Sequence, residues 1–273
     1  MPQHRIVAPP GVDRNEFRAF HRKALLELSR DAKKFHSANL KKGRLLTSSA
    51  AESRRLLKTP RKDAKALLES YLKSDAHKQI VKRGPRSRGL RGHNPARYAP
   101  YQFPWASLNA GGIGGGSLYP VDPNSGEVGA NLIDVIGGSG SAASAMGFWY
   151  QAQSTGSLFV SAQLWVSWGA AEVYALPGYA TANAFVKVFV QQWRPWYSLS
   201  AQSTIWDRSS YGFGIDVETG IEGNYSAGIT VPVVAGGWYA LWGALYQHVT
   251  AGGIASAVSN FDAYVGPITY VEV

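Results

Sequence analysis

Carboxylates that could act as a catalytic pair are concentrated at one place, Asp216-Val-Glu218 followed by Glu222. Glycoside hydrolysis uses two carboxyl groups at a set separation across a cleft. On a β-strand, Asp216 and Glu218 would share one face roughly 7 Å apart, because residues two apart point the same way. However, Thr219-Gly220 and Gly223-Asn224 indicate an immediate turn. We therefore interpret these carboxylates as a solvated acidic loop.

Other catalytic and metal-binding groups are sparse. His248 is the only histidine after residue 100, and no Gly-x-Ser-x-Gly nucleophile elbow accompanies it. The chain has no cysteine, which excludes disulfides, thiolate metal sites and cysteine nucleophiles. The glycines of 111–116 predict a mobile loop, and Asp122-Pro-Asn-Ser-Gly126 predicts a turn. We expect a non-enzymatic protein with no metal and no cofactor.

Aromatic residues are the better candidates for binding. Trp193, Trp196 and Tyr197 flank Arg194-Pro195 in a predicted loop, where a core does not require bulky rings. Exposed rings stack on sugar faces, on bases or against partner proteins. The sequence therefore predicts Trp193, Trp196, Tyr197 and Trp206 as ligand-binding residues at the surface, whereas Trp238 and Trp242 are predicted to lie inside.

These rings belong to a half of the chain that has the pattern of β-strands. Apolar residues alternate with others through Gly156–Trp168, and similar texture recurs at 184–190, 197–206, 226–234 and 267–273. Turn residues punctuate the stretch at 154–156, 176–178, 193–195, 207–210, 220, 236–237 and 252–253. This predicts an antiparallel β-sandwich or jelly roll over 98–273, with eight to ten strands of 5–12 residues that fold without the rest of the chain.

The N-terminal half differs in composition. Residues 1–100 carry 25 of the 28 Lys and Arg and 8 of the 18 acids, a net charge of +17, whereas 101–273 carry a net −7 and all nine tryptophans. Helix starts are predicted at Asp13, Ser49 and Thr59-Pro60, and Gly84-Pro85 ends the last helix. We therefore predict a basic helical region of about three short helices over 1–83 and a Gly/Pro/Arg linker over 84–97.

Bases cluster around that linker. Such a run neutralises phosphates and releases their counterions, so it can grip a nucleic acid or another polyanion, with binding that weakens steeply in salt. A solvated tether without a partner is the alternative. The predicted polyanion-binding residues are Lys82, Arg83, Arg86, Arg88, Arg91 and Arg97.

Targeting signals are not evident in the sequence. The N-terminus lacks the apolar segment of a secretory signal, and no window has the roughly 18 apolar residues of a spanning helix. We expect a protein of the cytoplasm, or one exported without a standard signal.

The β half resembles a group of bacterial β-sandwich domains without an assigned activity. The resemblance covers residues 98–273 and rests on Tyr101-Gln-Phe-Pro-Trp105, Asp122…Gly126, Gly138-Ser…Ala145-Met-Gly147, Thr204-Ile-Trp206, Trp238-Tyr-Ala-Leu-Trp242 and Ser259-Asn-Phe-Asp262. It implies a lectin-like fold and transfers no chemistry.

Three functions remain open at this point. The first is a β-sandwich module that binds a glycan or a protein surface through its aromatic loops. The second is a structural protein of a viral or virus-like homo-oligomeric assembly, whose basic arm binds nucleic acid. The third is an effector or toxin whose basic half serves in transport.

Overall fold

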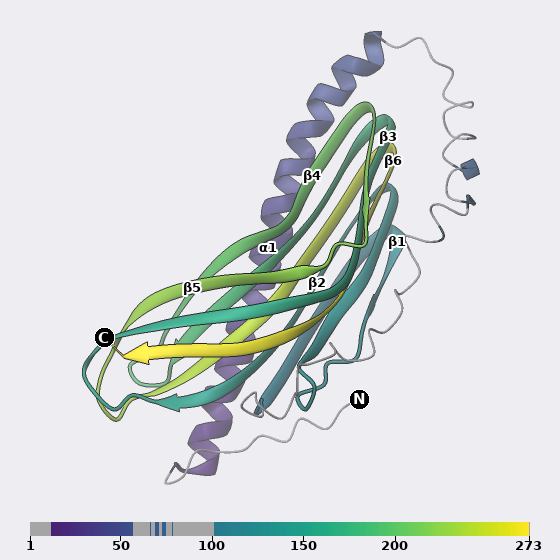
Figure 1. The fold of residues 1–273 in the computed structure, drawn as a ribbon. Helices are drawn as coiled ribbons and strands as arrows, with labels where there is room; N and C mark the ends of the chain where they lie inside the picture. The colour runs from purple at the N-terminus through teal and green to yellow at the C-terminus, as the bar shows by residue number, and fades with distance from the viewer. Residues whose placement is uncertain are drawn as a thin grey trace.

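The protein is mainly β, with one long helix before the strands (Figure 1). The computed structural model describes residues 12–56, 66, 69–70, 73–74, 78 and 101–272. Helix α1 spans Arg14–Leu56, and the strands are β1 (Phe103–Leu118), β2 (Glu127–Gln151), β3 (Gly156–Gln192), β4 (Tyr197–Thr219), β5 (Gly223–Val233) and β6 (Trp238–Glu272). The predicted class, an antiparallel β-sandwich after a helical region, is confirmed.

All six strands belong to one antiparallel sheet. Its order is β1-β2-β6-β3-β4, and β5 pairs with the first part of β3. The pairing slips between Gly111 and Ile113 in β1, between Val135 and Gly138 in β2, and between Ala175 and Gly178 in β3. These irregularities lie at one level across the sheet, because β1 pairs with β2, and β2 and β3 both pair with β6. We call this line the crease.

At the crease the long strands bend and the sheet folds back on itself (Figure 1). The helix-side layer contains 103–111, 138–151, 178–192, 197–212 and 238–251, and the outer layer contains 113–118, 127–135, 156–175, 214–219, 223–233 and 255–272. The layers touch closely: a Cβ built on Gly243 would lie 2.8 Å from Cγ1 of Val265 and 3.1 Å from Cβ of Ala162. One folded sheet therefore forms both halves of the sandwich.

The strands are longer and fewer than predicted. The six strands of the described chain run from 11 to 37 residues, because β3 and β6 each cross the crease into both layers. The predicted turns at 154–156, 193–195, 220 and 236–237 are confirmed, whereas 176–178, 207–210 and 252–253 lie within strands. The glycine run 111–116 was wrongly predicted as a mobile loop. It belongs to β1, which pairs with β2 on both sides of the register shift between Gly111 and Ile113.

Helix α1 covers the helix-side layer. Oδ1 of Asp13 accepts from the backbone N–H of Asn15 and Glu16 at 2.9 and 3.1 Å, which confirms the predicted start. The apolar stripe of the helix is buried on the sheet against aromatic side chains of β1, β2, β3 and β6: its members are Phe17, Phe20, Ala24 and Leu28, and the rings include Phe103, Trp149, Phe189 and Trp242.

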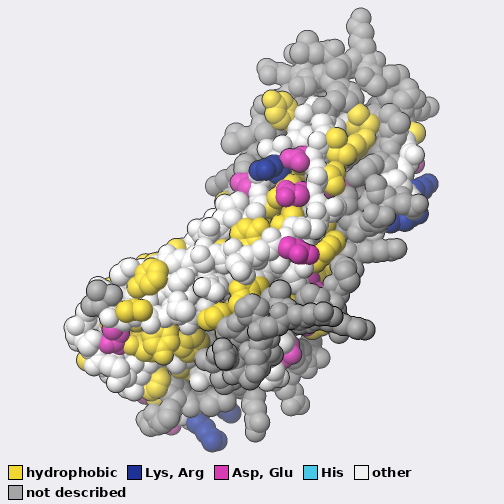
Figure 2. Space-filling view, in the orientation of Figure 1, with side chains coloured by type: hydrophobic (Ala, Val, Ile, Leu, Met, Phe, Trp, Pro, Cys, Tyr) yellow, Lys and Arg dark blue, Asp and Glu magenta, His cyan; other side chains and the backbone are white. Residues whose placement is uncertain are grey.

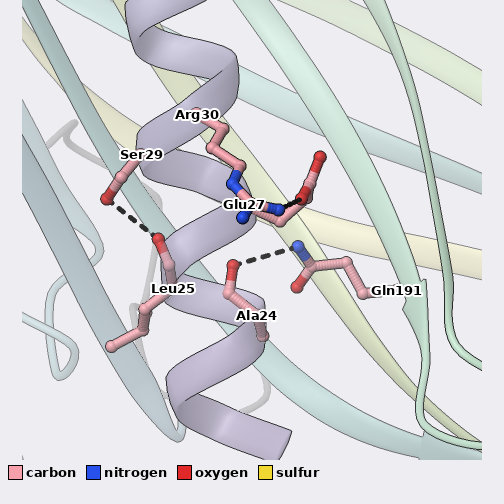
Figure 3. Close-up of polar contacts among 6 residues, drawn as sticks. All are labelled: Ala24, Leu25, Glu27, Ser29, Arg30 and Gln191. Atoms are coloured by element: carbon pink, nitrogen blue, oxygen red, sulfur yellow. Dashed lines mark hydrogen bonds and ion pairs between the residues drawn. The ribbon is translucent and has the colours of Figure 1, made fainter.

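Polar side chains also attach the helix to the sheet. Nε2 of Gln191 in β3 donates to the Ala24 carbonyl at 3.2 Å (Figure 3), and its Oε1 accepts from Nε1 of Trp242 at 2.9 Å. Further along, Nζ of Lys187 lies 2.6 Å from Oδ2 of Asp31. Each of these buried groups is therefore partnered across the interface, which avoids the cost of an unpaired polar group.

The helix also runs further than predicted. It continues to Leu56 through Ser49, where a second helix was expected to begin. Residues 37–56 contain one glycine and no proline, so nothing in them ends a helix. No helix in the described ranges is long and apolar enough to cross a membrane.

A matched pair of leucines tests whether α1 is a layer of the domain, rather than part of a separate unit as the sequence suggests. Leu28 is fully buried on the sheet, whereas Leu26 is 53% exposed on the other side of the same helix. We expect Leu28→Ala to lower the free energy of unfolding by about 2–5 kcal/mol, and Leu26→Ala to change it by less than about 0.5 kcal/mol. Urea titration measures both, and equal effects would contradict a docked helix.

A buried carboxyl lies at the crease. Asp134 in β2 is 1% exposed, and its Oδ2 accepts from the backbone N–H of Ala251, where the pairing of β2 with β6 is interrupted. Burial raises the pKa of Asp134 from 3.8 to about 7, and the backbone hydrogen bonds from Ala251 and Val135 oppose this rise.

This carboxyl makes stability fall with rising pH. The folded chain retains a proton on Asp134 that the unfolded chain loses near pH 4, so its contribution declines until the pH passes the folded pKa. Between pH 5 and pH 8 this group should remove about 2–3 kcal/mol. Asp134→Asn retains an acceptor for Ala251 and should abolish that decline, making the variant more stable than the parent at pH 8. Denaturant titrations at both pH values measure the free energy of unfolding of parent and variant. If the variant loses as much stability between pH 5 and pH 8 as the parent, the assignment to Asp134 is refuted.

Candidate functional site: a tryptophan pocket beside helix α1

A concave pocket lies between the first turns of α1 and the turn that joins β3 to β4. Its volume is about 300 Å³, and its lining residues are Glu16, Ala19, Phe20, Lys23, Trp193, Arg194 and Trp196. We call it the tryptophan pocket. Residues 178 positions apart in the chain, Glu16 and Arg194, meet here because α1 packs across the sheet end where β3 turns into β4.

Backbone and amide contacts position the β3–β4 turn. The Trp193 N–H donates to the Trp238 carbonyl at 3.0 Å, and Nε2 of Gln192 donates to the Arg194 carbonyl at 2.8 Å. The Arg194–Pro195 peptide bond is cis. The turn therefore holds its two tryptophans through contacts with β6 and β3.

Aromatic rings form the apolar part of the pocket. Phe20 of α1 contacts both tryptophans, with centroid distances of 5.8 Å to Trp193 and 5.5 Å to Trp196. Phe20 is buried, whereas both tryptophan side chains are partly exposed. The helix thus supports the tryptophans from below and leaves part of each open to a ligand.

Charged groups surround the rings. Nη2 of Arg194 lies 3.0 Å from Oε1 of Glu16, and the Arg194 guanidinium lies 5.4 Å from the centroid of the Trp193 ring. Nζ of Lys23 lies 4.7 Å from the centroid of Trp196. The pocket therefore offers several N–H donors and one carboxylate beside aromatic surface, a combination suited to binding.

The tryptophan pocket does not have the groups of a hydrolytic site. Among the described lining residues Glu16 is the one carboxylate, whereas acid–base hydrolysis of a glycoside needs two. Across the described part of the chain, no cluster of three or more His, Asp or Glu is placed to hold a metal ion.

The structure brings together two of the four predicted aromatic residues. Trp193 and Trp196 share the pocket, but Tyr197 is directed elsewhere. Its hydroxyl donates to the Pro232 carbonyl at 2.5 Å, its ring packs against the sandwich core, and burial raises its pKa above the usual value.

The prediction of Trp206 as a surface residue was wrong. Its side chain is 4% exposed, because pairing with Ala184 turns it toward the sandwich core, and its Nε1 donates to Oε2 of Glu218 at 2.8 Å. Trp242 is buried as predicted, and Trp238 is partly buried.

The acidic cluster also differs from its interpretation as a loop. Asp216 and Glu218 lie in β4, where the Asp216 carboxylate pairs with Nε of Arg208 at 3.2 Å. Glu222 lies in the following turn and is exposed. The predicted polyanion-binding residues, Lys82, Arg83, Arg86, Arg88, Arg91 and Arg97, lie outside the described residues, so their role stays a prediction.

Two further tryptophans point away from the core. Trp165 and Trp168 are separated by an odd number of residues, which in a regular strand would place them on opposite faces. The register shift between Val166 and Trp168 places both on the outer face of the outer layer, opposite Tyr264 and Asp262. Figure 2 shows the outer layer from the side away from α1, where hydrophobic side chains are spread over the surface with acidic ones among them.

Sequence reasoning missed the helical half of the tryptophan pocket. Glu16, Phe20 and Lys23 belong to a helix whose apolar stripe is evident, and the stripe predicts that Phe20 is buried. It does not indicate which end of the sheet receives it. The two sides of the pocket therefore meet only in the folded chain.

Among known proteins, the chain is similar to solved structures, and the similarity is in architecture. No protein-family model matches the chain, and no curated protein matches it. Similar solved structures include TmCBM61 in complex with β-1,4-galactotriose (TM-score 0.24, 10% identity, covering 59% of this chain and 88% of that one). Another is the CBM22-1 xylan-binding domain of Paenibacillus barcinonensis Xyn10C (TM-score 0.17, 8% identity, covering 59% and 87%). The likeness is to lectin-like β-sandwich domains and concerns the fold alone.

Proposed function

We propose that this protein is a non-enzymatic β-sandwich module that binds a glycan in the tryptophan pocket. The observation that carries the proposal is the meeting of two partly exposed tryptophans with Glu16, Lys23 and Arg194 in one concave site. A sugar has apolar C–H faces and a rim of hydroxyl groups, so it needs aromatic surface together with donors and acceptors.

The shape of the pocket favours a small ligand over a protein surface. Its volume of about 300 Å³ is at the lower end of the range for small-molecule sites. Protein interfaces bury much larger and flatter areas. A glycan end, one or a few sugar units long, is the ligand that we infer.

Preorganisation supports the same conclusion. Both tryptophan rings pack on the buried ring of Phe20, which restricts their motion before any ligand binds. Such a site loses less side-chain entropy on binding than a site whose side chains must first be ordered, which lowers one of the costs of association.

Substitution of the tryptophans tests the proposal. A glycan array with the full chain identifies the ligand, and calorimetry with that glycan then compares variants. We expect Trp196→Ala to weaken binding at least tenfold, which corresponds to about 1.4 kcal/mol, and Trp196→Phe to weaken it less because a ring remains. Trp193→Ala should act in the same direction.

Trp165→Ala is the matched control, because Trp165 is also partly exposed but lies on the opposite side of the sandwich. It should leave glycan affinity unchanged, and thermal unfolding verifies that every variant is folded. Equal weakening by Trp165→Ala, or an array without any bound glycan, would refute the proposal. Mass spectrometry should show the bound glycan intact; cleavage would contradict the non-enzymatic assignment.

A further inference from the structure

A second concave site lies on the other flank of α1, between the helix and the edge strand β1. It is a groove of about 540 Å³, and the side chains that matter to its chemistry are Arg18, Arg22, Leu25, Leu26 and Trp105. It shares no residue with the tryptophan pocket, whose helical residues are Glu16, Ala19, Phe20 and Lys23. We call it the arginine groove.

One side of the groove is cationic, and the described part of the chain places no counter-charge beside it. Arg18 and Arg22 are one helical turn apart and both exposed, so their guanidinium groups emerge from the same face. Among the described residues, neither arginine takes part in an ion pair, whereas Arg30 on the same helix pairs with Glu27. Within the described ranges, no acidic residue lines the groove.

The other side of the groove is apolar. Leu26 is 53% exposed, Leu25 is partly buried and Trp105 of β1 closes the floor. Apolar surface left in water is stabilised when a ligand covers it. The groove therefore joins two arginines that form no ion pair with a described residue to partly exposed apolar surface.

We propose that the arginine groove binds a single-chain anionic amphiphile, such as a long-chain fatty carboxylate. The carboxylate binds Arg18 and Arg22, because a guanidinium offers paired N–H donors that match a carboxylate. The acyl chain lies along Leu25, Leu26 and Trp105. A volume of about 540 Å³ is typical of small-molecule sites, and the concave form between helix and strand fits one chain rather than a flat bilayer.

The test measures binding of oleate and of oleyl alcohol to the full chain by calorimetry, below the concentration at which either aggregates. Oleyl alcohol has the same tail without the charge. We expect oleate to bind more tightly than the alcohol. The double variant Arg18→Gln/Arg22→Gln should weaken the binding of oleate at least tenfold and leave the affinity for oleyl alcohol unchanged. Leu26→Gln should weaken the binding of both.

Arg30→Gln is the control, because it removes a positive charge from the same helix outside the groove. It should leave both affinities unchanged. If Arg30→Gln weakens oleate binding as much as the double variant does, the effect reflects the net charge of the helix, and the proposal is overturned.

Two other outcomes would overturn it as well. One is failure of monomeric oleate to bind while vesicles of anionic phosphatidylglycerol bind through Arg18 and Arg22, which would make this face a membrane-binding surface. The other is binding of a short DNA duplex that is lost in the double arginine variant and unchanged in Leu26→Gln. Trp196→Ala should not affect oleate, so the outcome is independent of glycan binding.

Discussion

Burial of the helix-side layer on both of its faces is the constraint on which the rest of this structure depends. Antiparallel sheets commonly leave one face in water. Here residues 239–252 of β6 are buried without interruption, so alternate side chains on both faces need cover. The outer layer supplies it on one face and α1 on the other. Removing either cover would expose aromatic residues of the central strands to solvent.

The crease meets the first half of that requirement. In this sheet the ladder is interrupted at the same level in each pair of strands that crosses the bend, and an interruption leaves backbone groups without their regular partners. Gly253 adopts φ +78° there, a conformation that favours glycine, and a Cβ on the adjacent Gly252 would collide with the Tyr179 ring. Asp134 accepts one interrupted N–H, so a carboxyl is buried at the bend despite its desolvation.

The periodicity of the sequence predicts local secondary structure. It does not predict where strands bend or which side chains turn inward, because those depend on how the strands pair. Alternation correctly identifies stretches of β structure such as 156–168 and 184–190, and the stripe from Phe17 to Leu28 correctly identifies the buried face of α1. Leu176-Pro-Gly178 contains the residues of a turn, but such residues also form the irregularity at which a strand bends, so strand number was overestimated. The sequence does not distinguish Trp206, which is buried, from Trp193, which is partly exposed. Only pairing with Ala184 directs the former inward, while the β3–β4 turn leaves the latter partly exposed.

The second cover explains why both candidate sites lie beside the helix. A cylinder on a sheet contacts it along one line and diverges on either flank, so it creates a groove on each side. On one flank the β3–β4 turn contributes tryptophans beside Lys23 and Glu16. On the other, the edge strand β1 contributes Trp105 beside Arg18 and Arg22. The helix is therefore a structural layer and also supplies half of each site, so its docking controls both.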